Sequence, residues 1–426
     1  MSEQSGAVTK TANGLLQWVD KRLPVLDFWN AHLAKYYAPK NFNFWYYMGG
    51  FALLVLVIQI LSGIFLTMHY KPDADLAFAS VEYIMRDVPA GWFVRYLHGV
   101  GASMFFLVVY LHMFRAMLYG SHRKPRELIW LLGMVIYVAL MAEAFFGYLL
   151  PWGNMSYWGA QVIISLFGAI PVIGEPLAEW IRGDFVVSDA TLNRFFAFHV
   201  ILLPLLLALL VYLHIVALHK VGSNNPDGVD IKKNKDKDGN PVDGVPFHPY
   251  YTVKDTFGIA VFMTVFLGIV FFVPEFGGWF LEKDNFAPAD ILQTPPDIVP
   301  LWYLTPYYSI LRAVTFEWLP GGAKLWGVIA MGAAIVMFFF LPWLDRAKVR
   351  SIRYRGWMYK TALTIFAVTF VMLGYLGTKN PGHVDLFVFE NVIWAQIGLV
   401  LYFAFFLLMP IYTRFDPTKP EPDRVG

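Results

Sequence analysis

The sequence contains no cysteine. Iron–sulfur clusters and covalently attached c-type haem both use cysteine thiols, so any such centre must belong to a partner of this chain. Charge is scarce as well. Charged residues make up 15% of the 426 residues and hydrophobic residues 58%, whereas a soluble domain averages about 25% charged residues. This composition excludes a soluble globule of this length and predicts a polytopic membrane protein.

Two other features are missing. The net charge is only +2 and no basic cluster is present, which argues against a nucleic-acid partner. The N-terminus has no short apolar core followed by small residues, so we expect no cleavable signal peptide. Residues 1–44 instead carry apolar side chains at helical spacing, which predicts an interfacial helix on the membrane surface. These side chains are Leu15, Leu16, Val19, Leu23 and Leu26.

Eight apolar runs follow this segment, and each is long enough to cross a bilayer as a helix. They cover residues 45–68, 93–119, 128–150, 195–219, 256–273, 325–344, 358–376 and 390–411. The expected fold class is all-α, a polytopic membrane protein with eight transmembrane helices, of which the first four form a four-helix bundle. An even number of spans places both termini on one side of the membrane.

Lysine and arginine indicate which side that is. The connections 120–127, 220–254 and 345–357 are rich in these residues, and the longer connections on the opposite side are poor in them. By the positive-inside rule, both termini face the cytoplasm, the negative side of a bacterial inner membrane.

The same runs divide the chain into four parts. We expect an interfacial segment (1–44), a four-helix bundle (45–222), a polar loop on the negative side (223–254) and a C-terminal transmembrane domain (255–426). Within the polar loop, residues 223–244 read as a mobile insert.

Four histidines lie inside two of the apolar runs, where polar side chains are costly. His98 and His112 are 14 residues apart, which is ~21 Å along a helix with a ~40° rotational offset; His199 and His214 are 15 apart, ~22 Å with ~60° the other way. One span separates the two helices, so they run in the same direction. His98 is then level with His199, and His112 with His214. Neutral imidazoles suit iron, and haem offers two axial positions to each pair, so we predict two non-covalent b-type haems.

Two pairs of glycines repeat the histidine spacing. Gly49 and Gly63 lie in the first span, and Gly133 and Gly147 in the third, each pair 14 residues apart. Small-residue helix packing would explain glycines in such helices. The matched spacing favours a different role, because glycine lets a flat macrocycle approach the backbone at the depth of each haem.

Two arginines lie near the two ends of the second span. Arg95 precedes His98 by three residues, and Arg115 follows His112 by three. Each is placed to pair with haem propionates at its membrane surface. Arginines that extend to the interface from a helix end are the alternative explanation.

Several longer motifs carry a family resemblance. They are the histidine quartet, the four glycines, Gly147-Tyr-Leu-Leu-Pro-Trp-Gly153, Met155-Ser-Tyr-Trp-Gly-Ala160, Asn193-Arg-Phe-Phe-Ala-Phe-His199 and Pro300-Leu-Trp-Tyr303. With them, the chain from about residue 30 onward resembles cytochrome b of the bc1 complex, the quinol:cytochrome c oxidoreductase. The resemblance implies low-potential haem bL between His98 and His199, and high-potential haem bH between His112 and His214.

The resemblance also implies two quinone pockets. Quinone reduction (Qi) on the negative side involves the matching positions His219, Ser223, Lys254 and Asp255. From the residues alone, a solvated interfacial histidine is the preferred interpretation of His219. Quinol oxidation (Qo) on the positive side involves the matching positions Phe145, Tyr148, Gly159, Pro300, Trp302, Tyr303 and Tyr308.

The sequence departs from the family pattern at one of these positions. Many members carry Pro-Glu-Trp-Tyr, and this chain has Leu301 in place of the glutamate. A leucine side chain cannot accept a quinol proton. Two carboxylates are candidates for that role. Glu143 lies inside an apolar run, but helical phase puts it on the haem-facing side of its helix rather than beside Tyr148. Glu275 lies at the positive-side end of the fifth span with better access to solvent, and we rank it first.

The expected activity follows from the resemblance. One quinol electron goes to a Rieske iron–sulfur protein and then cytochrome c1, and the other crosses through bL and bH to quinone, in a homodimeric complex surrounded by membrane lipid. A b6f-like or menaquinol-linked reductase is the closest alternative. A polytopic transporter with proton-relay histidines is another, and a reduced-minus-oxidised spectrum without b-type bands would favour it.

Overall fold

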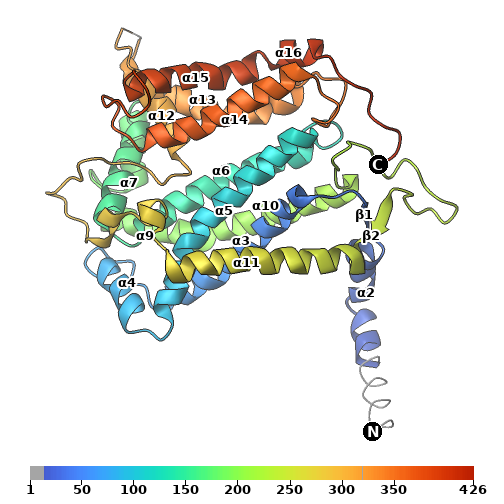
Figure 1. Cartoon of the computed structure of the whole chain (residues 1–426). Helices are drawn as coiled ribbons and strands as arrows, with labels where there is room; N and C mark the ends of the chain where they lie inside the picture. The colour runs from blue at the N-terminus through green and yellow to red at the C-terminus, as the bar shows by residue number, and fades with distance from the viewer. Residues whose placement is uncertain (1–13, 319) are drawn as a thin grey trace.

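The computed structural model describes residues 14–318 and 320–426. Seven of its helices are long and apolar enough to cross a membrane, and two further helices bent by 57° form an eighth candidate span. With this bent pair counted as one span, the predicted eight-span, mostly helical fold is confirmed. The spans contain α3 (Tyr47–Thr67), α5 (Gly91–Tyr119), α6 (Glu127–Leu149), α9 (Asp189–Ala197) with η3 (Phe198–Leu202) and α10 (Leu203–Val221), η4 (Phe247–Tyr251) with α11 (Thr252–Phe272), α13 (Gly322–Leu344), α14 (Trp357–Gly377), and α15 (Asn391–Leu407) with α16 (Met409–Phe415) (Figure 1).

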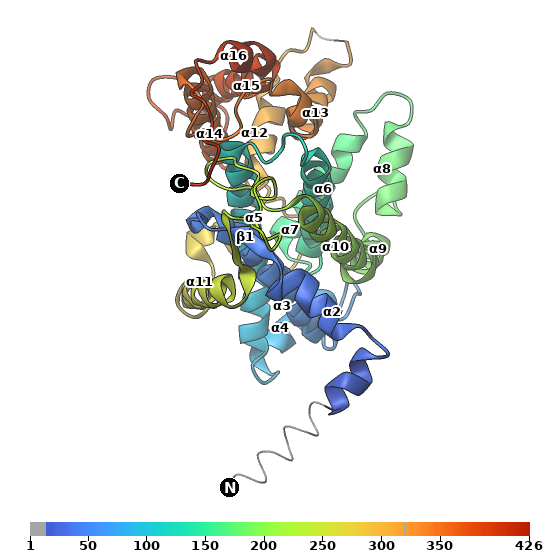
Figure 2. The same cartoon turned by 90° about the vertical axis from the view of Figure 1, so that its right-hand side faces the viewer.

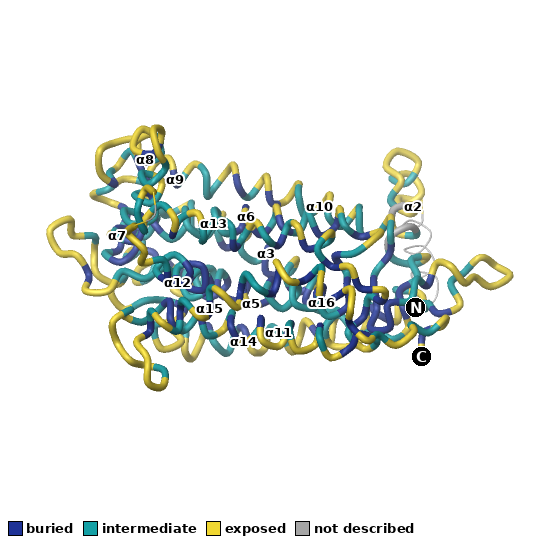
Figure 3. Tube along the Cα trace, turned by 90° about the horizontal axis from the view of Figure 1, so that it is seen from above, coloured by how far each residue is buried: buried dark blue, intermediate teal, exposed yellow. Residues whose placement is uncertain are grey.

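The outer faces of these helices are apolar and exposed. Leu205 is 68% exposed on α10, and Phe272 is 83% exposed at the end of α11. Exposed residues recur along the outer helices when the molecule is seen from above (Figure 3). Contiguous apolar surface on this scale suits hydrocarbon rather than water, and a helix satisfies its own backbone hydrogen bonds there.

The helices pack in two groups. In the first, α3 packs on α5, and α6 packs on α10. Helix α11 joins this group through a stacked contact between Phe262 and Phe51 of α3, with ring centroids 4.6 Å apart. The sequence alone put α11 with the C-terminal spans. In the second group, α12 (Thr305–Ala313) packs against α13, α14 and α15. Figure 2 shows this second group and α11 on opposite sides of α5.

Tyrosines connect the two groups in the interior. The Tyr137 hydroxyl of α6 donates a hydrogen bond to the Tyr307 hydroxyl of α12 at 2.9 Å. Tyr110 of α5 lies 3.1 Å from Tyr137, hydroxyl to hydroxyl, and also donates to the Tyr303 carbonyl. Because a buried hydroxyl without a partner is costly, this chain of hydrogen bonds fixes how the groups sit together.

The two ends of the helix bundle differ. One end carries the short elements α4 (Ala77–Arg86), α7 (Asn154–Phe167), α8 (Gly174–Arg182), η5 (Phe276–Gly278) and η6 (Lys283–Phe286). The other end carries α2 (Val25–Trp29), η1 (Asn30–Ala34), β1 (Tyr37–Pro39), η2 (Phe44–Tyr46), β2 (Gly244–Pro246) and the C-terminus. Strands β1 and β2 pair antiparallel. The all-α prediction missed this sheet, because a three-residue strand leaves no periodic pattern.

Residues 1–13 of the predicted interfacial segment lie outside the described residues. In the part that is described, Leu15, Leu16 and Leu23 are exposed, so much of their apolar surface is not covered by the rest of the described chain. The segment is broken by Pro24, which precedes α2.

The insert 223–244 is less free than the sequence suggests. Its exposed middle is bounded by two buried aspartates. Asp227 accepts a hydrogen bond from Arg353 at 2.8 Å, and Asp243 accepts one from Arg424 at 2.7 Å. A buried carboxylate requires such partners, so both ends of the insert are anchored to the rest of the chain, and the mobility of the insert stays a prediction.

The last predicted span, 390–411, is not one straight helix. Helix α15 ends at Leu407 and α16 starts at Met409. Pro410 explains the break, because its ring removes a backbone donor and clashes with the preceding turn.

Candidate functional site

The four histidines meet as two pairs. The ring centroids of His98 and His199 lie 6.1 Å apart with an interplanar angle of 87°. Those of His112 and His214 lie 6.4 Å apart at 65°. Helix α5 supplies the first member of each pair and the α9–α10 span supplies the second. We call them the first pair and the second pair.

A local irregularity helps the α10 span to present both of its histidines. His199 lies in η3, a π-helical turn that ends just before Pro204. Proline lacks the backbone donor that an α-turn needs there. A π turn takes more residues per revolution than an α turn, so it reduces the ~60° offset expected between His199 and His214.

The spacing of both pairs fits a metal between the rings. A metal bound at about 2 Å by one nitrogen of each imidazole would hold the centroids roughly 6 Å apart, since each centroid lies about 1 Å behind its nitrogen. In the first pair the other nitrogens are already engaged. His98 Nδ1 lies 2.9 Å from Ser62 Oγ, and His199 Nδ1 lies 2.9 Å from the Glu143 carbonyl. Such bonds fix ring orientation and leave Nε2 for a ligand.

A glycine faces each histidine of the first pair. A Cβ on Gly63 would lie 3.3 Å from His98 Cε1, and a Cβ on Gly147 would collide with the His199 ring. These two glycines therefore let the imidazole rings approach the backbones of α3 and α6 more closely than a residue with a Cβ would allow.

The second pair repeats this arrangement. A Cβ on Gly49 would lie 3.2 Å from His112 Cε1, and one on Gly133 would lie 3.4 Å from His214 Cε1. Glycines of α3 and α6 thus flank both pairs, and the residues present fit a planar macrocycle at each.

The two arginines lie beyond the pairs on α5. Arg95 lines the cavity at the first pair. Arg115 donates from Nη2 to the Asn224 carbonyl at 3.0 Å, while its buried Nε has no partner among the described residues. An unpaired buried guanidinium nitrogen is costly, and an anionic group would satisfy it.

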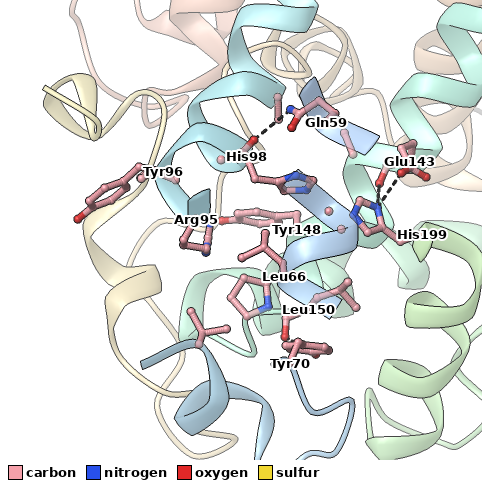
Figure 4. Close-up of a pocket in the computed structure, with 18 of the residues that line it drawn as sticks. Gln59, Leu66, Tyr70, Arg95, Tyr96, His98, Glu143, Tyr148, Leu150 and His199 are labelled. Atoms are coloured by element: carbon pink, nitrogen blue, oxygen red, sulfur yellow. Dashed lines mark hydrogen bonds and ion pairs between the residues drawn. The ribbon is translucent and has the colours of Figure 1, made fainter. Parts of the chain in front are cut away.

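The first pair opens into a cavity of about 560 Å³. Figure 4 shows His98, His199 and Tyr148 pointing into this cavity, with Glu143 beside His199. Tyr303, Leu301 and Glu282 line it from the C-terminal half of the chain. The buried Tyr303 hydroxyl has no hydrogen-bond partner among the described residues, so this cavity offers a polar ligand one free donor.

Five residues that the resemblance assigns to quinol oxidation do not line this cavity: Phe145, Gly159, Pro300, Trp302 and Tyr308. Gly159 lies behind Tyr148, since a Cβ there would be 3.7 Å from that ring. Phe145 packs against Phe195, Trp302 donates to Ser103 at 3.0 Å, and Tyr308 bonds the Ile298 carbonyl. Their role in quinol oxidation therefore stays a prediction.

The carboxylates are arranged differently from the predicted ranking. Glu275 follows the end of α11 at Phe272, is exposed and does not line the cavity. Glu143 faces His199, with Oε1 3.2 Å from Nδ1, as its helical phase indicated. The carboxylate that reaches Tyr148 is Glu282, which accepts a hydrogen bond from the Tyr148 hydroxyl.

Sequence reasoning missed Glu282. Burial raises the pKa of its carboxyl to about 7, with Asp284 adding to the rise and the Tyr148 hydrogen bond opposing it. The connection that contains Glu282 shows no helical or strand periodicity, so the sequence does not indicate which way this side chain points. The only signal was the missing carboxylate at Leu301, which suggested that another acid takes its place.

At the second pair, the predicted quinone-reduction residues lie among aromatic rings. His219 stacks on Tyr36 with ring centroids 4.8 Å apart, and the Tyr36 hydroxyl lies 3.3 Å from Ser223 Oγ. Tyr36 is a second residue that sequence reasoning missed, because it falls in the segment read as interfacial.

Lys254 and Asp255 begin α11 nearby. The Lys254 ammonium lies 4.5 Å from the Tyr250 ring centroid, and Asp255 faces the Tyr46 hydroxyl. The ring of Phe247 contacts Tyr36 and so links His219 to this part of the chain.

Two protein-family descriptions match this chain. Residues 33–222 match the family described as "Cytochrome b/b6/petB", and residues 288–408 match "Cytochrome b(C-terminal)/b6/petD". Among solved structures, a "Hyperthermophilic respiratory Complex III" chain matches with a TM-score of 0.84 and 36% identity, covering 94% of this chain and 99% of that one.

Curated relatives match this chain over nearly its whole length. "Cytochrome b" of Allochromatium vinosum is 60% identical over 420 residues, covering 98% of this chain and 99% of the relative. "Cytochrome b/c1" of Bradyrhizobium diazoefficiens is 45% identical over 416 residues, which cover 97% of this chain but 57% of that longer protein. With these identities and the same helical fold, the chain belongs to the cytochrome b family, as the cytochrome b of a bc1-type respiratory Complex III.

Proposed function

We propose that this chain holds two b-type haems, one at the first pair (bL) and one at the second (bH), and oxidises quinol beside the first pair and reduces quinone beside the second. The observation that carries this proposal is the set of ring separations, 6.1 and 6.4 Å, with a glycine facing every ring. Bound haem supplies one-electron transfer between the two ends of the bundle.

Haem and quinol share the cavity of the first pair in this proposal: haem is held between His98 and His199, and quinol takes the part lined by Tyr148, Leu301 and Tyr303. In that part the side chains bind and orient the substrate. Tyr303 donates its free buried hydroxyl to a quinol oxygen, and Leu301 presents an apolar wall. Tyr148 and the residues packed behind it, Gly159 among them, shape the cavity. Arg95 pairs with a propionate at this end.

At the quinone end, His219 and Asp255 hydrogen-bond the quinone oxygens and pass protons to them, with Ser223 and Lys254 completing the pocket. Tyr36 supports His219 by stacking. Arg115 pairs with a propionate of the haem at the second pair through its unpartnered Nε.

The membrane orientation follows from charge. Arg123, Lys124 and Arg353 lie in connections at the end that also carries β1, β2 and the C-terminus. This end faces the cytoplasm by the positive-inside rule. Quinol oxidation then releases protons on the positive side, quinone reduction takes them up on the negative side, and the protein contributes to a proton-motive force.

The partners belong to the same proposal. A Rieske iron–sulfur protein and cytochrome c1 accept the other quinol electron. Their cofactors belong to separate subunits, since this chain has no cysteine to hold them. The printed name "Cytochrome b/c1" of the longer Bradyrhizobium relative supports a close association with c1. We propose a homodimeric complex in the bacterial inner membrane.

Spectra of histidine variants test this proposal. His98→Leu should abolish the b-type signal of the first pair and keep that of the second, and His112→Leu should do the reverse. His383→Leu, which changes an exposed histidine outside both pairs, is the control. Wild-type membranes without b-type bands in a reduced-minus-oxidised spectrum would refute the proposal.

A further inference from the structure

We infer that Glu282 accepts a proton from quinol in the cavity beside the first pair, in the role left open by Leu301. This inference rests on the proposed quinol oxidation. It is carried by a carboxylate that faces the cavity, lies in the same lining as Leu301 and Tyr303, and is hydrogen-bonded by Tyr148.

The segment that follows Glu282 holds it in place. Glu282 directly precedes η6, and η6 packs against α7. Asn285 Oδ1 accepts a hydrogen bond from the Ser156 amide at 2.9 Å, and a Cβ on Gly153 would collide with Asn285. This close approach of η6 to the start of α7 fixes the backbone next to Glu282 and directs its side chain inward.

The other carboxylates near this end are excluded by position. Glu143 is engaged with His199. Glu275 is exposed and outside the lining. Glu82 lines the cavity but is paired with Arg86 at 2.6 Å near its rim. Glu282 is the acid in this lining that bonds Tyr148.

The surroundings of Glu282 suit a proton acceptor near neutral pH. Burial and the neighbouring Asp284 hold its pKa at about 7, so the carboxylate and the acid are both populated. A base with a pKa near the working pH is the most efficient in proton transfer. The other ionisable groups that line the cavity are Tyr70, Glu82, Arg86, Arg95, Tyr96, His98, Glu143, Tyr148, His199 and Tyr303.

The proposed step balances simply. A quinol O–H bond breaks, its proton forms a new O–H bond on the Glu282 carboxylate, and the electrons leave to the one-electron acceptors of the complex. The resulting acid is neutral. Asp284 follows two residues later and is exposed, so its carboxylate is available to pass the proton on to water. The second quinol O–H bond breaks as well, and its proton goes to a base on the partner subunit that takes up the first electron.

The experiment uses the purified complex and measures quinol:cytochrome c reductase activity between pH 5.5 and 9. Glu282→Gln should lower the turnover rate at least about 10-fold at pH 7 and remove the rise in rate near that pH, and Glu282→Asp should retain both. Glu275→Gln is the matched control, a glutamate in the same connection but outside the cavity. Normal rates and an unchanged pH profile in Glu282→Gln would overturn the inference.

Tyr148→Phe provides an independent readout. The Tyr148 hydrogen bond lowers the pKa of Glu282, so its removal raises that pKa and should shift the rising limb of the pH profile to higher pH. An equal loss of rate at every pH in Glu282→Gln and Tyr148→Phe would show a structural role only and overturn the inference. If wild-type enzyme has b-type haem but oxidises no quinol, the proposed function fails instead.

Discussion

The glycines beside the histidines give the sharpest prediction for cofactor binding. Gly147→Ala should selectively remove or weaken haem binding at the first pair, because the new Cβ would collide with the His199 ring and approach its Nδ1 to 2.7 Å. Overpacking of this kind costs about 1–3 kcal/mol. If that cost falls on the loaded site, the affinity for haem drops roughly 5- to 150-fold, at 1.4 kcal/mol per factor of ten.

The size of the effect should follow the gap at each glycine. Gly133→Ala, where the gap is 3.4 Å, should be nearly tolerated, and Gly49→Ala and Gly63→Ala at 3.2 and 3.3 Å should be intermediate. Gly50→Ala is the control, because a Cβ there meets nothing within 4 Å. Haem content and redox titration of each b-type band measure the series. Equal b-type haem spectra in Gly147→Ala and Gly50→Ala would refute the role of Gly147 in haem binding.

Three further variants test other parts of the structure. Ser62→Ala removes the 2.9 Å bond to His98 Nδ1 and should weaken haem binding at the first pair about 10-fold or shift its midpoint potential, as a redox titration would show. Asp345→Asn breaks the buried ion pair with Arg355 and should lower the free energy of unfolding by about 3–5 kcal/mol. Thermal unfolding in detergent should then occur at a lower temperature than in a control variant in which an exposed aspartate is changed to asparagine. Arg424 holds the pKa of Asp243 down at about 2. Because the pKa of Asp243 is depressed in the folded state, its ion pair with Arg424 stabilises the fold fully above about pH 4 and is lost as the pH falls toward 2. Proteolysis of the C-terminal tail should therefore accelerate as the pH falls over that range. In Asp243→Asn the tail should be cleaved faster already at neutral pH.

The helical parts of the site were predictable because a helix converts sequence spacing into position. A spacing of 14 residues puts His98 and His112 on one face, and the same arithmetic applies to Gly133 and Gly147. The structure brings these residues together as two ring pairs with glycines against them. The π turn at His199 could not be derived by that arithmetic, since it depends on the proline that follows.

Residues in irregular segments carry no such rule. Glu275 and Glu282 are seven residues apart in one connection, and nothing periodic tells which of them turns inward. Tertiary contacts decide: η6 packs on α7 through Asn285, and this places Glu282 rather than Glu275 in the cavity. Tyr36 reaches His219 for a similar reason, because the pairing of β1 with β2 carries its segment across the bundle end.

The split between site residues on helices and site residues in connections matches what each part of the proposed reaction requires. Electron transfer between two fixed cofactors needs a constant separation, and rigid helices packed in a bilayer supply it, so the proposed haem ligands lie on spans. A proton must leave the same cavity and reach water, and an acid at the bundle end is closer to water than one in the middle of a span. An acid on the connection at the bundle end has one side in the cavity and the other near solvent, as Glu282 and the exposed Asp284 do. A loop position also explains how this function can move along the chain: replacement of one acid by Leu301 costs little if another segment of the same connection already brings a carboxylate to Tyr148.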